Sequence, residues 1–134
     1  MRPSFFTSFL VLLPLASTSI ARVISITAPT NVGAGEAFNL IFKTQTYIQN
    51  WSDEFAIVGA RLSTFSECDG CLGTIIGKFD LYTQGYENTI TGNFSESITI
   101  QSPGSYNIIA AVASVAGASQ EADMNFYTTT VQVN

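Results

Sequence analysis

The sequence contains no histidine, and this absence excludes much of the chemistry that enzymes perform. None of its 134 residues can act as the imidazole base of a Ser-His-Asp or Cys-His site or ligate a metal through imidazole. Its ten acidic side chains leave carboxylate pairs as the remaining catalytic option, as in glycoside hydrolases. The pairs Asp53-Glu54 and Glu121/Asp123 are more typical of solvated loop charges. We therefore expect no enzymatic activity, no metal and no cofactor.

Basic side chains are also scarce, with five Lys and Arg against ten Asp and Glu and a net charge of −5. Arg2 lies in a leader described below, and the other four are scattered along the chain: Arg22, Lys43, Arg61 and Lys78. Nucleic acids and anionic membranes attract clustered Lys and Arg. We therefore expect neither of them as a partner.

Cysteine occurs only twice, as Cys68 and Cys71. This spacing is found in redox motifs, but no helix follows that could stabilise a thiolate at the first cysteine. A zinc site would need two more ligands. In an exported protein the pair favours a disulfide, which closes a short loop and contributes about 2 kcal/mol by loop-closure entropy. We predict a local Cys68–Cys71 disulfide.

A long apolar run is present only near the N-terminus. It covers Phe5–Ala16, follows the positive charge of Arg2 and precedes small residues at Ser19 and Ala21. This is the pattern of a signal peptide, and the run is shorter than the roughly 18 residues that span a bilayer. We predict a signal peptide over residues 1–21, no membrane anchor, and a secreted single domain over residues 22–134.

Alternating apolar and polar residues, rich in β-branched and aromatic side chains, predict seven strands in this domain. They cover Val23–Ala28, Phe38–Thr46, Glu54–Leu62, Thr74–Leu81, Ser95–Ile100, Tyr106–Val115 and Met124–Val133. Turn-prone clusters separate them, at Asn31–Gly35, Asp69-Gly70, Thr91–Asn93 and Pro103-Gly104. The predicted fold is all-β: an immunoglobulin-like antiparallel β-sandwich of about seven strands. We expect its core to contain Phe38, Leu40, Phe42, Ile98, Ile100 and Ile108.

The sixth of these segments carries two further interpretations. Its alanine-rich part, Ile108–Ala113, could form a buried helix by propensity alone, but the preceding Pro-Gly turn favours a strand covered on both faces. Tyr106 fits the tyrosine corner of immunoglobulin-like domains, with Ile108 in the place of the second core cysteine. The alternative for Tyr106 is an ordinary half-buried strand position.

Two sequons, at Asn50 and Asn93, lie near predicted strand ends. Chance alone predicts roughly one to two sequons in a chain this rich in Ser and Thr, so their number is not evidence of glycosylation. Their positions leave Asn50 and Asn93 open to glycosylation during secretion.

Several short motifs, taken in order, resemble the necrosis-inducing secreted protein family of fungal effectors. They are Arg22–Pro29, Ala37–Asn39, Thr44–Gln49 with its Tyr47-Ile48-Gln49 triplet, Leu72–Thr74, Phe79–Leu81 and Thr130–Val133. The resemblance covers essentially the whole mature chain, although each motif is short. The Cys68–Cys71 loop has no fixed counterpart in the family pattern.

The resemblance implies a small secreted effector that a fungus delivers to a plant. Such effectors bind receptor-associated immune kinases of the host, suppress pattern-triggered immunity and in some cases provoke cell death. They would act in the apoplast, the host cytoplasm or both, and we expect a monomer. The role of Tyr47, Ile48 and Gln49 is unknown, and packing at a strand end is the alternative to direct contact with a partner.

A second hypothesis is a secreted module that binds carbohydrate or the cell wall. Trp51, Tyr82 and Tyr86 lie near predicted strand ends, where exposed rings could stack on sugars. Core or loop packing is the alternative role for these rings.

Overall fold

The computed structural model describes residues 20–47, 51–82, 93–116 and 120–134. These ranges form eight strands and no helix, so none of them supplies a helix that could cross a membrane. The strands are β1 (Ile20–Thr27), β2 (Asn31–Val32), β3 (Ala37–Tyr47), β4 (Trp51–Leu62), β5 (Thr74–Asp80), β6 (Phe94–Thr99), β7 (Gly104–Ala116) and β8 (Ala122–Val133). All seven predicted strands are present, with ends shifted by a few residues.

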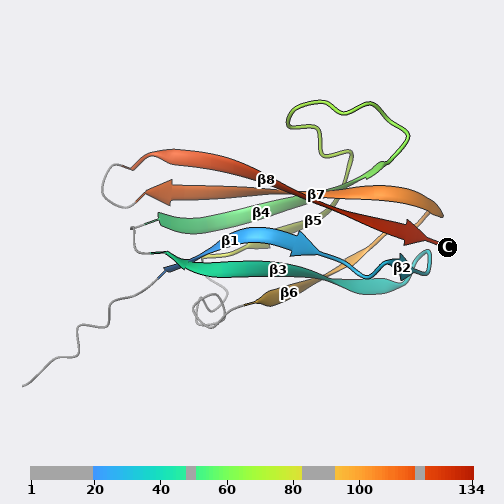
Figure 1. Ribbon diagram of the computed structural model, residues 1–134, viewed down its shortest axis with the longest axis horizontal. Coiled ribbons are helices and arrows are strands. Elements are labelled where there is room, and N and C mark those ends of the chain that lie inside the picture. Colours follow the sequence, from blue (N-terminus) through green and yellow to red (C-terminus); the bar gives the residue numbers. More distant parts are fainter. Residues whose placement is uncertain (1–19, 48–50, 83–92, 117–119) are drawn as a thin grey trace, which may run out of the picture.

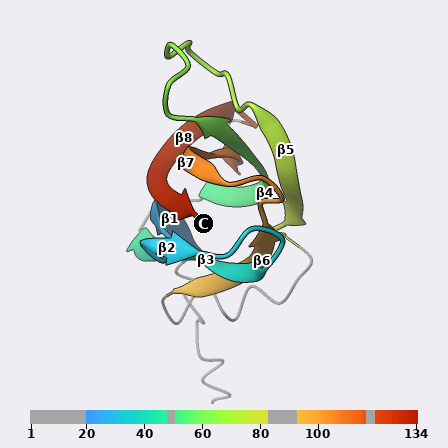
Figure 2. The ribbon, with the colours of Figure 1, turned by 90° about the vertical axis from the view of Figure 1, so that its right-hand side faces the viewer.

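The strands form two sheets packed face to face, which confirms the predicted sandwich (Figures 1 and 2). One sheet has three strands in the order β1-β3-β6, and the other has five in the order β2-β8-β7-β4-β5. Neighbours are antiparallel except β2 and β8, which run parallel. β5 pairs with β4 at the edge of the larger sheet. Variable-type immunoglobulin domains have an extra strand at this position, whereas constant-type domains have none there.

Strand β2 was not predicted, because its residues fall in a segment interpreted as a turn. Asn31 and Val32 pair with Gln132 and Val133 of β8. Backbone hydrogen bonds of 2.9 Å from Asn134 N–H to the Val32 carbonyl, and from Ala34 N–H to the Asn134 carbonyl, extend the pairing. This short strand depends on a distant partner, which local sequence pattern does not reveal.

The core lies between the sheets and contains all six predicted core residues. Phe38, Leu40, Phe42, Ile98, Ile100 and Ile108 are each at most 8% exposed. The rings of Phe42 and Phe94 stack with centroids 4.8 Å apart, and Phe79 meets Phe42 edge-on at 6.5 Å. These aromatic contacts join β3, β5 and β6 across the sandwich.

The alanine-rich segment is a strand, as predicted. β7 lies between β4 and β8, so both of its edges are paired and both of its faces are partly covered. Ile108, Ala110 and Val112 belong to the core cluster, whereas Ile109 and Ala111 lie on the opposite face and are still buried. Small side chains suit such a central strand because large ones on its neighbours cover it.

The tyrosine corner is also confirmed. The Tyr106 hydroxyl donates a hydrogen bond of 2.9 Å to the carbonyl oxygen of Ser102, four residues upstream. Ile108 is fully buried two residues later, where antibody domains place the second core cysteine. A buried apolar side chain therefore stands where those domains have a disulfide-bonded cysteine.

A buried polar cluster contradicts the expectation that Asp53 is a solvated loop charge. Asp53 lies in β4 and is 2% exposed. Its carboxylate accepts hydrogen bonds from the Val23 N–H at 2.7 Å and the Ser114 hydroxyl at 2.6 Å, and the Arg22 guanidinium lies 3.7 Å away. The Tyr127 hydroxyl donates a hydrogen bond of 2.8 Å to the Val23 carbonyl. The Tyr127 pKa is raised, mainly because the hydroxyl is partly buried and also because the negative charge of Asp53 is near. The cluster ties β1 to the five-stranded sheet.

A β-bulge explains why the sequence pattern misled here. The register of β4 with β7 shifts between Asp53 and Phe55, so Glu54 is the extra residue. The shift places Asp53 on the inner face with Ala56, and Phe55 on the outer face. Strict alternation would place Asp53 and Phe55 on the same face.

Candidate protein-binding face

The outer face of the five-stranded sheet carries an unusual number of large apolar side chains. Residues directly opposite each other in an antiparallel pair share a face, so the register defines this surface. Phe55 lies opposite Ala113, which lies opposite Met124, and Ile57 lies opposite Ala111, which lies opposite Phe126. We call Phe55, Ile57, Ile75, Met124 and Phe126 the apolar face.

The small residues of β7 form the floor of this face. Gly59 of β4 lies between Ile75 of β5 and Ile109 of β7 in a third row. Ala111 is only 3% exposed, because larger side chains rise on both sides of it. β4 and β8 therefore carry two apolar ridges with the alanine strand between them.

Four residues of the apolar face are well exposed to solvent. Phe55 is 42% exposed, Ile75 45%, Met124 43% and Phe126 48%, and Ile57 is partly exposed. These four make up half of the eight exposed large hydrophobic residues in the described part of the chain. Single exposed apolar residues are common, whereas a contiguous group on one face is typical of interaction sites.

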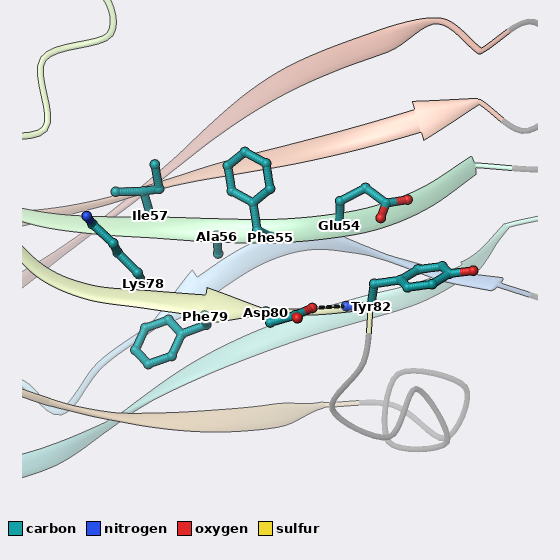
Figure 3. Close-up of a pocket in the computed structure, with 8 residues that line it drawn as sticks. All are labelled: Glu54, Phe55, Ala56, Ile57, Lys78, Phe79, Asp80 and Tyr82. Carbon is teal, nitrogen blue, oxygen red and sulfur yellow. Dashed lines mark hydrogen bonds between the residues drawn. The ribbon is translucent and has the colours of Figure 1, made fainter.

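Charged groups border the apolar face along the edge of the sheet. An open hollow of about 550 Å³ lies over β4 and β5 and includes Glu54, Phe55, Lys78, Asp80 and Tyr82 in its lining (Figure 3). In Figure 3, Phe55 and Glu54 extend from one side of β4, whereas the ring of Phe79 extends toward the other sheet. Lys78 lies opposite Ile57 in the register. An apolar centre with a charged border is the usual arrangement of protein-binding surfaces.

The predicted disulfide is present between Cys68 and Cys71. Both cysteines are exposed, and they lie in the loop that joins β4 to β5. The Cys71 N–H donates a hydrogen bond of 3.1 Å to the Cys68 carbonyl, and Gly70 has a φ of 76°, which suits glycine. The bridge therefore closes a tight turn, as expected.

The other residues singled out in the sequence lie away from the apolar face or outside the described residues. Tyr47 ends β3 at the edge of a described range, and Ile48, Gln49 and Asn50 lie outside the described residues. Asn93 is exposed immediately before β6. Whether Asn50 or Asn93 carries a glycan stays a prediction.

Of the three aromatic residues considered for sugar stacking, Trp51 has an internal partner. The Arg22 guanidinium carbon lies 4.8 Å from the centre of the Trp51 ring, so one face of this half-buried ring is covered. Tyr82 is 61% exposed, and Tyr86 lies outside the described residues. Of the two that the structure describes, Tyr82 lines the hollow beside the apolar face and Trp51 does not.

Sequence reasoning did not identify the apolar face. In β4, apolar residues occupy both faces, a pattern that fits a strand buried on both sides equally well. The alternation of Met124 and Phe126 with Asn125 and Tyr127 was a usable signal, but it does not say which side faces solvent. In the part of the chain that the structure describes, no group of three or more acidic or cysteine side chains could hold a metal ion.

The sequence profile of the Nis1 family matches residues 19–132, which is nearly the whole chain. The chain belongs to the Nis1 family. Among similar Nis1 proteins, the Necrosis-inducing secreted protein 1 of Colletotrichum orbiculare is 35% identical over 132 residues, covering 96% of this chain and 80% of the relative. That of Colletotrichum higginsianum is 32% identical over 116 residues, covering 84% and 78%. The family resemblance predicted from short motifs is confirmed.

Membership in the Nis1 family makes this a secreted protein of an effector family rather than of a known enzyme family. Among solved structures, the superoxide reductase (neelaredoxin) of Ignicoccus hospitalis is similar with a TM-score of 0.55 and 11% identity. The match covers 85% of this chain and 82% of that one. At this identity the likeness concerns the fold alone.

Proposed function

We propose that this secreted protein suppresses pattern-triggered immunity of a plant by binding receptor-associated immune kinases through the apolar face. The observation that carries the proposal is the group of exposed Phe55, Met124 and Phe126, which lie in two neighbouring rows over the alanine floor of β7. In this proposal the protein binds and inhibits without catalysis, acts as a monomer, and in some plants causes the necrosis for which its relatives are named.

The shape and composition of the apolar face support a protein partner. Binding energy at protein interfaces comes mainly from a few central apolar and aromatic side chains that a charged rim surrounds. Phe55 and Phe126 lie in neighbouring rows of this face, and Lys78 and Asp80 border it. A partner that covers the face would remove several large apolar side chains from water at once.

Co-precipitation with the cytoplasmic domain of a plant receptor-associated kinase tests the proposal, combined with an assay of that kinase. We expect the secreted protein to be retained and the kinase to be inhibited. The double variant Phe55→Ser, Phe126→Ser should bind at least about tenfold more weakly, because such central side chains are typically worth more than 1 kcal/mol each.

Ile24 and Ile41 provide a matched control, since they are exposed on the three-stranded sheet at 47% and 38%. The double variant Ile24→Ser, Ile41→Ser likewise removes two exposed apolar side chains, from the other side of the sandwich, and should bind like the natural protein. The same set should be expressed in leaves, with the reactive-oxygen burst after elicitor treatment as the readout. Equal suppression by both double variants would contradict a role for the apolar face.

A further inference from the structure

The loop between β4 and β5 covers one end of the apolar face. Residues 63–73 rise from the sheet as the green loop at the top of Figures 1 and 2. A hollow of about 330 Å³ lies between this loop and the sheet, and its lining includes both cysteines, Arg61, Ile109 and Phe126. An added Cβ on Gly70 would lie 3.8 Å from the tip of the Phe126 ring. The turn closed by the disulfide therefore rests against the apolar face.

The two ends of this loop are firmly attached to the sheet. At one end the Ser63 N–H donates to the Ser105 carbonyl at 2.9 Å. At the other, Leu72 packs on Gly59 so closely that a Cβ there would lie 2.1 Å from the Leu72 carbonyl oxygen. Between these points, no backbone hydrogen bond joins residues 66–71 to the sheet in the described ranges. The disulfide joins two residues within the tip and not the tip to the sheet, so it restrains the shape in which the tip rests on the apolar face.

The tip lies over one apolar and one charged side chain of the sheet, Ile109 and Arg61. Ile109 is only 6% exposed although it lies on the outer face of the sheet, because the loop lies above it. The Nε of Arg61, in the lining of the same hollow, is buried and has no hydrogen-bond partner among the described residues.

We propose that the Cys68–Cys71 disulfide is a redox switch that sets how much of the apolar face a protein partner can reach. With the bridge formed, the tip covers Ile109 and one side of Phe126. With the bridge reduced, the tip moves away, water reaches Arg61, and Ile109 joins the apolar face. The proposal concerns the regulation of the binding surface proposed above and rests on that function for its biological role.

The chemistry requires a thiol reductant of the glutathione or thioredoxin class. A reductant thiolate attacks one sulfur of the bridge and forms a mixed disulfide, which a second reductant thiol then resolves. The protein gains two thiols and two electrons, and the reductant leaves as its own disulfide. Both cysteines are exposed, so the attack needs no prior unfolding. Such reductants maintain thiols in the cytosol but not outside the cell.

Hydrogen exchange on the full secreted protein, oxidised and reduced by glutathione, tests the switch without any kinase. We expect reduction to speed exchange at least about tenfold at the Cys71 N–H, which is hydrogen-bonded to the Cys68 carbonyl within the turn, with β3 amides as the unchanged internal reference. Fluorescence of an apolar anilinonaphthalene dye should rise several-fold on reduction. The double variant Cys68→Ser, Cys71→Ser should show the higher fluorescence without reductant, and the further change Phe126→Ser should cancel most of the rise.

Two results would overturn the switch. If exchange at the Cys71 N–H and dye fluorescence are the same in both redox states, the loop stays closed without its bridge. If reduction abolishes the cooperative thermal transition, the disulfide maintains the fold rather than a local cover. Kinase binding is measured separately on the same samples. Dye and exchange changes without any kinase binding would support the switch and contradict the proposed function.

Discussion

Asp53 is the residue whose environment differs most from the expectation of its type. A buried carboxylate is tolerated here because it accepts two short hydrogen bonds, from Val23 N–H and the Ser114 hydroxyl, and lies beside the Arg22 guanidinium. Removing one member of such a cluster leaves the others buried and unsatisfied. The cluster therefore makes β1 depend on β4 and β7 for its position.

We predict that Asp53→Ala lowers the free energy of unfolding by about 3–5 kcal/mol, the range for a broken buried ion pair. Urea denaturation followed by far-ultraviolet circular dichroism measures this change. Asp123→Ala is the matched control, since Asp123 is an exposed acid at the start of β8. It should change stability by no more than about 0.5 kcal/mol. Equal effects of the two substitutions would show that the buried cluster contributes nothing special.

Glu96 gives a prediction with a defined pH dependence. Burial in β6 raises the pKa of this carboxyl above its ordinary value of 4.5. The folded state therefore binds the proton more tightly than the unfolded state, so this group lowers stability as pH rises through the folded pKa. Glu96→Gln should raise the free energy of unfolding at pH 7 and give no gain at about pH 3, below the ordinary Glu pKa. Denaturation at the two pH values measures the difference, and an equal gain at both would contradict burial as the cause.

At the scale of elements, β7 and its entry turn organise the larger sheet. The Tyr106 hydroxyl is hydrogen-bonded to the Ser102 carbonyl in the turn that precedes β7. Two residues further along, Ile108 is fully buried in the core. Because β7 pairs with both β4 and β8, the position at which β7 begins after the turn sets the register of β4, β7 and β8.

Replacing Tyr106 by Phe removes only the hydroxyl and should cost about 0.5–1.5 kcal/mol, the typical net value of one hydrogen bond. Ser102→Ala is the control, because Tyr106 bonds to the backbone carbonyl of Ser102 and not to its side chain. Thermal melts should show a lower midpoint for the first variant and a nearly unchanged one for the second. A normal midpoint for Tyr106→Phe would mean that the corner does not stabilise the turn.

The strands themselves could be predicted because each has a local signature. Alternation in Phe38, Leu40 and Phe42 identifies β3 and its inner face, and the Pro-Gly turn distinguishes β7 from a helix. Strand β2 could not be predicted, since it exists only through pairing with β8. The position of Asp53 could not be predicted either, because one inserted residue reverses the alternation.

The candidate site was harder to predict than the fold, for a physical reason. β4 has apolar residues on both of its faces, and this pattern predicts a strand that is buried on both faces. Only the layers that pack on each face show which side is exposed. Phe55 and Phe126 are far apart in sequence, and only the shared register with Ala111 and Ala113 shows that they form one surface. The Tyr47-Ile48-Gln49 triplet of the family resemblance does not point to this surface. Tyr47 ends β3 in the other sheet, and Ile48 and Gln49 lie outside the described residues.

At the scale of the whole molecule, the two sheets differ in their outer surfaces. The five-stranded sheet carries the apolar face together with the loop that covers part of it, whereas the three-stranded sheet exposes Ile24 and Ile41 separately, on different strands. The polar cluster at Asp53 and the aromatic contacts around Phe42 lie between the sheets and hold them together. These contacts join the two layers, and the apolar face leaves large apolar side chains exposed on one side of the molecule.

The apolar face also has a consequence for colloidal behaviour. Two copies that meet through this face could bury it against each other, and the long-range repulsion between acidic molecules opposes that encounter at neutral pH. The net charge of −5 at pH 7 approaches zero as the pH falls toward the isoelectric point of about 4.3 that the composition gives. Light scattering should then rise as the solution is acidified, and the double variant Phe55→Ser, Phe126→Ser should stay clear under conditions that make the natural protein turbid.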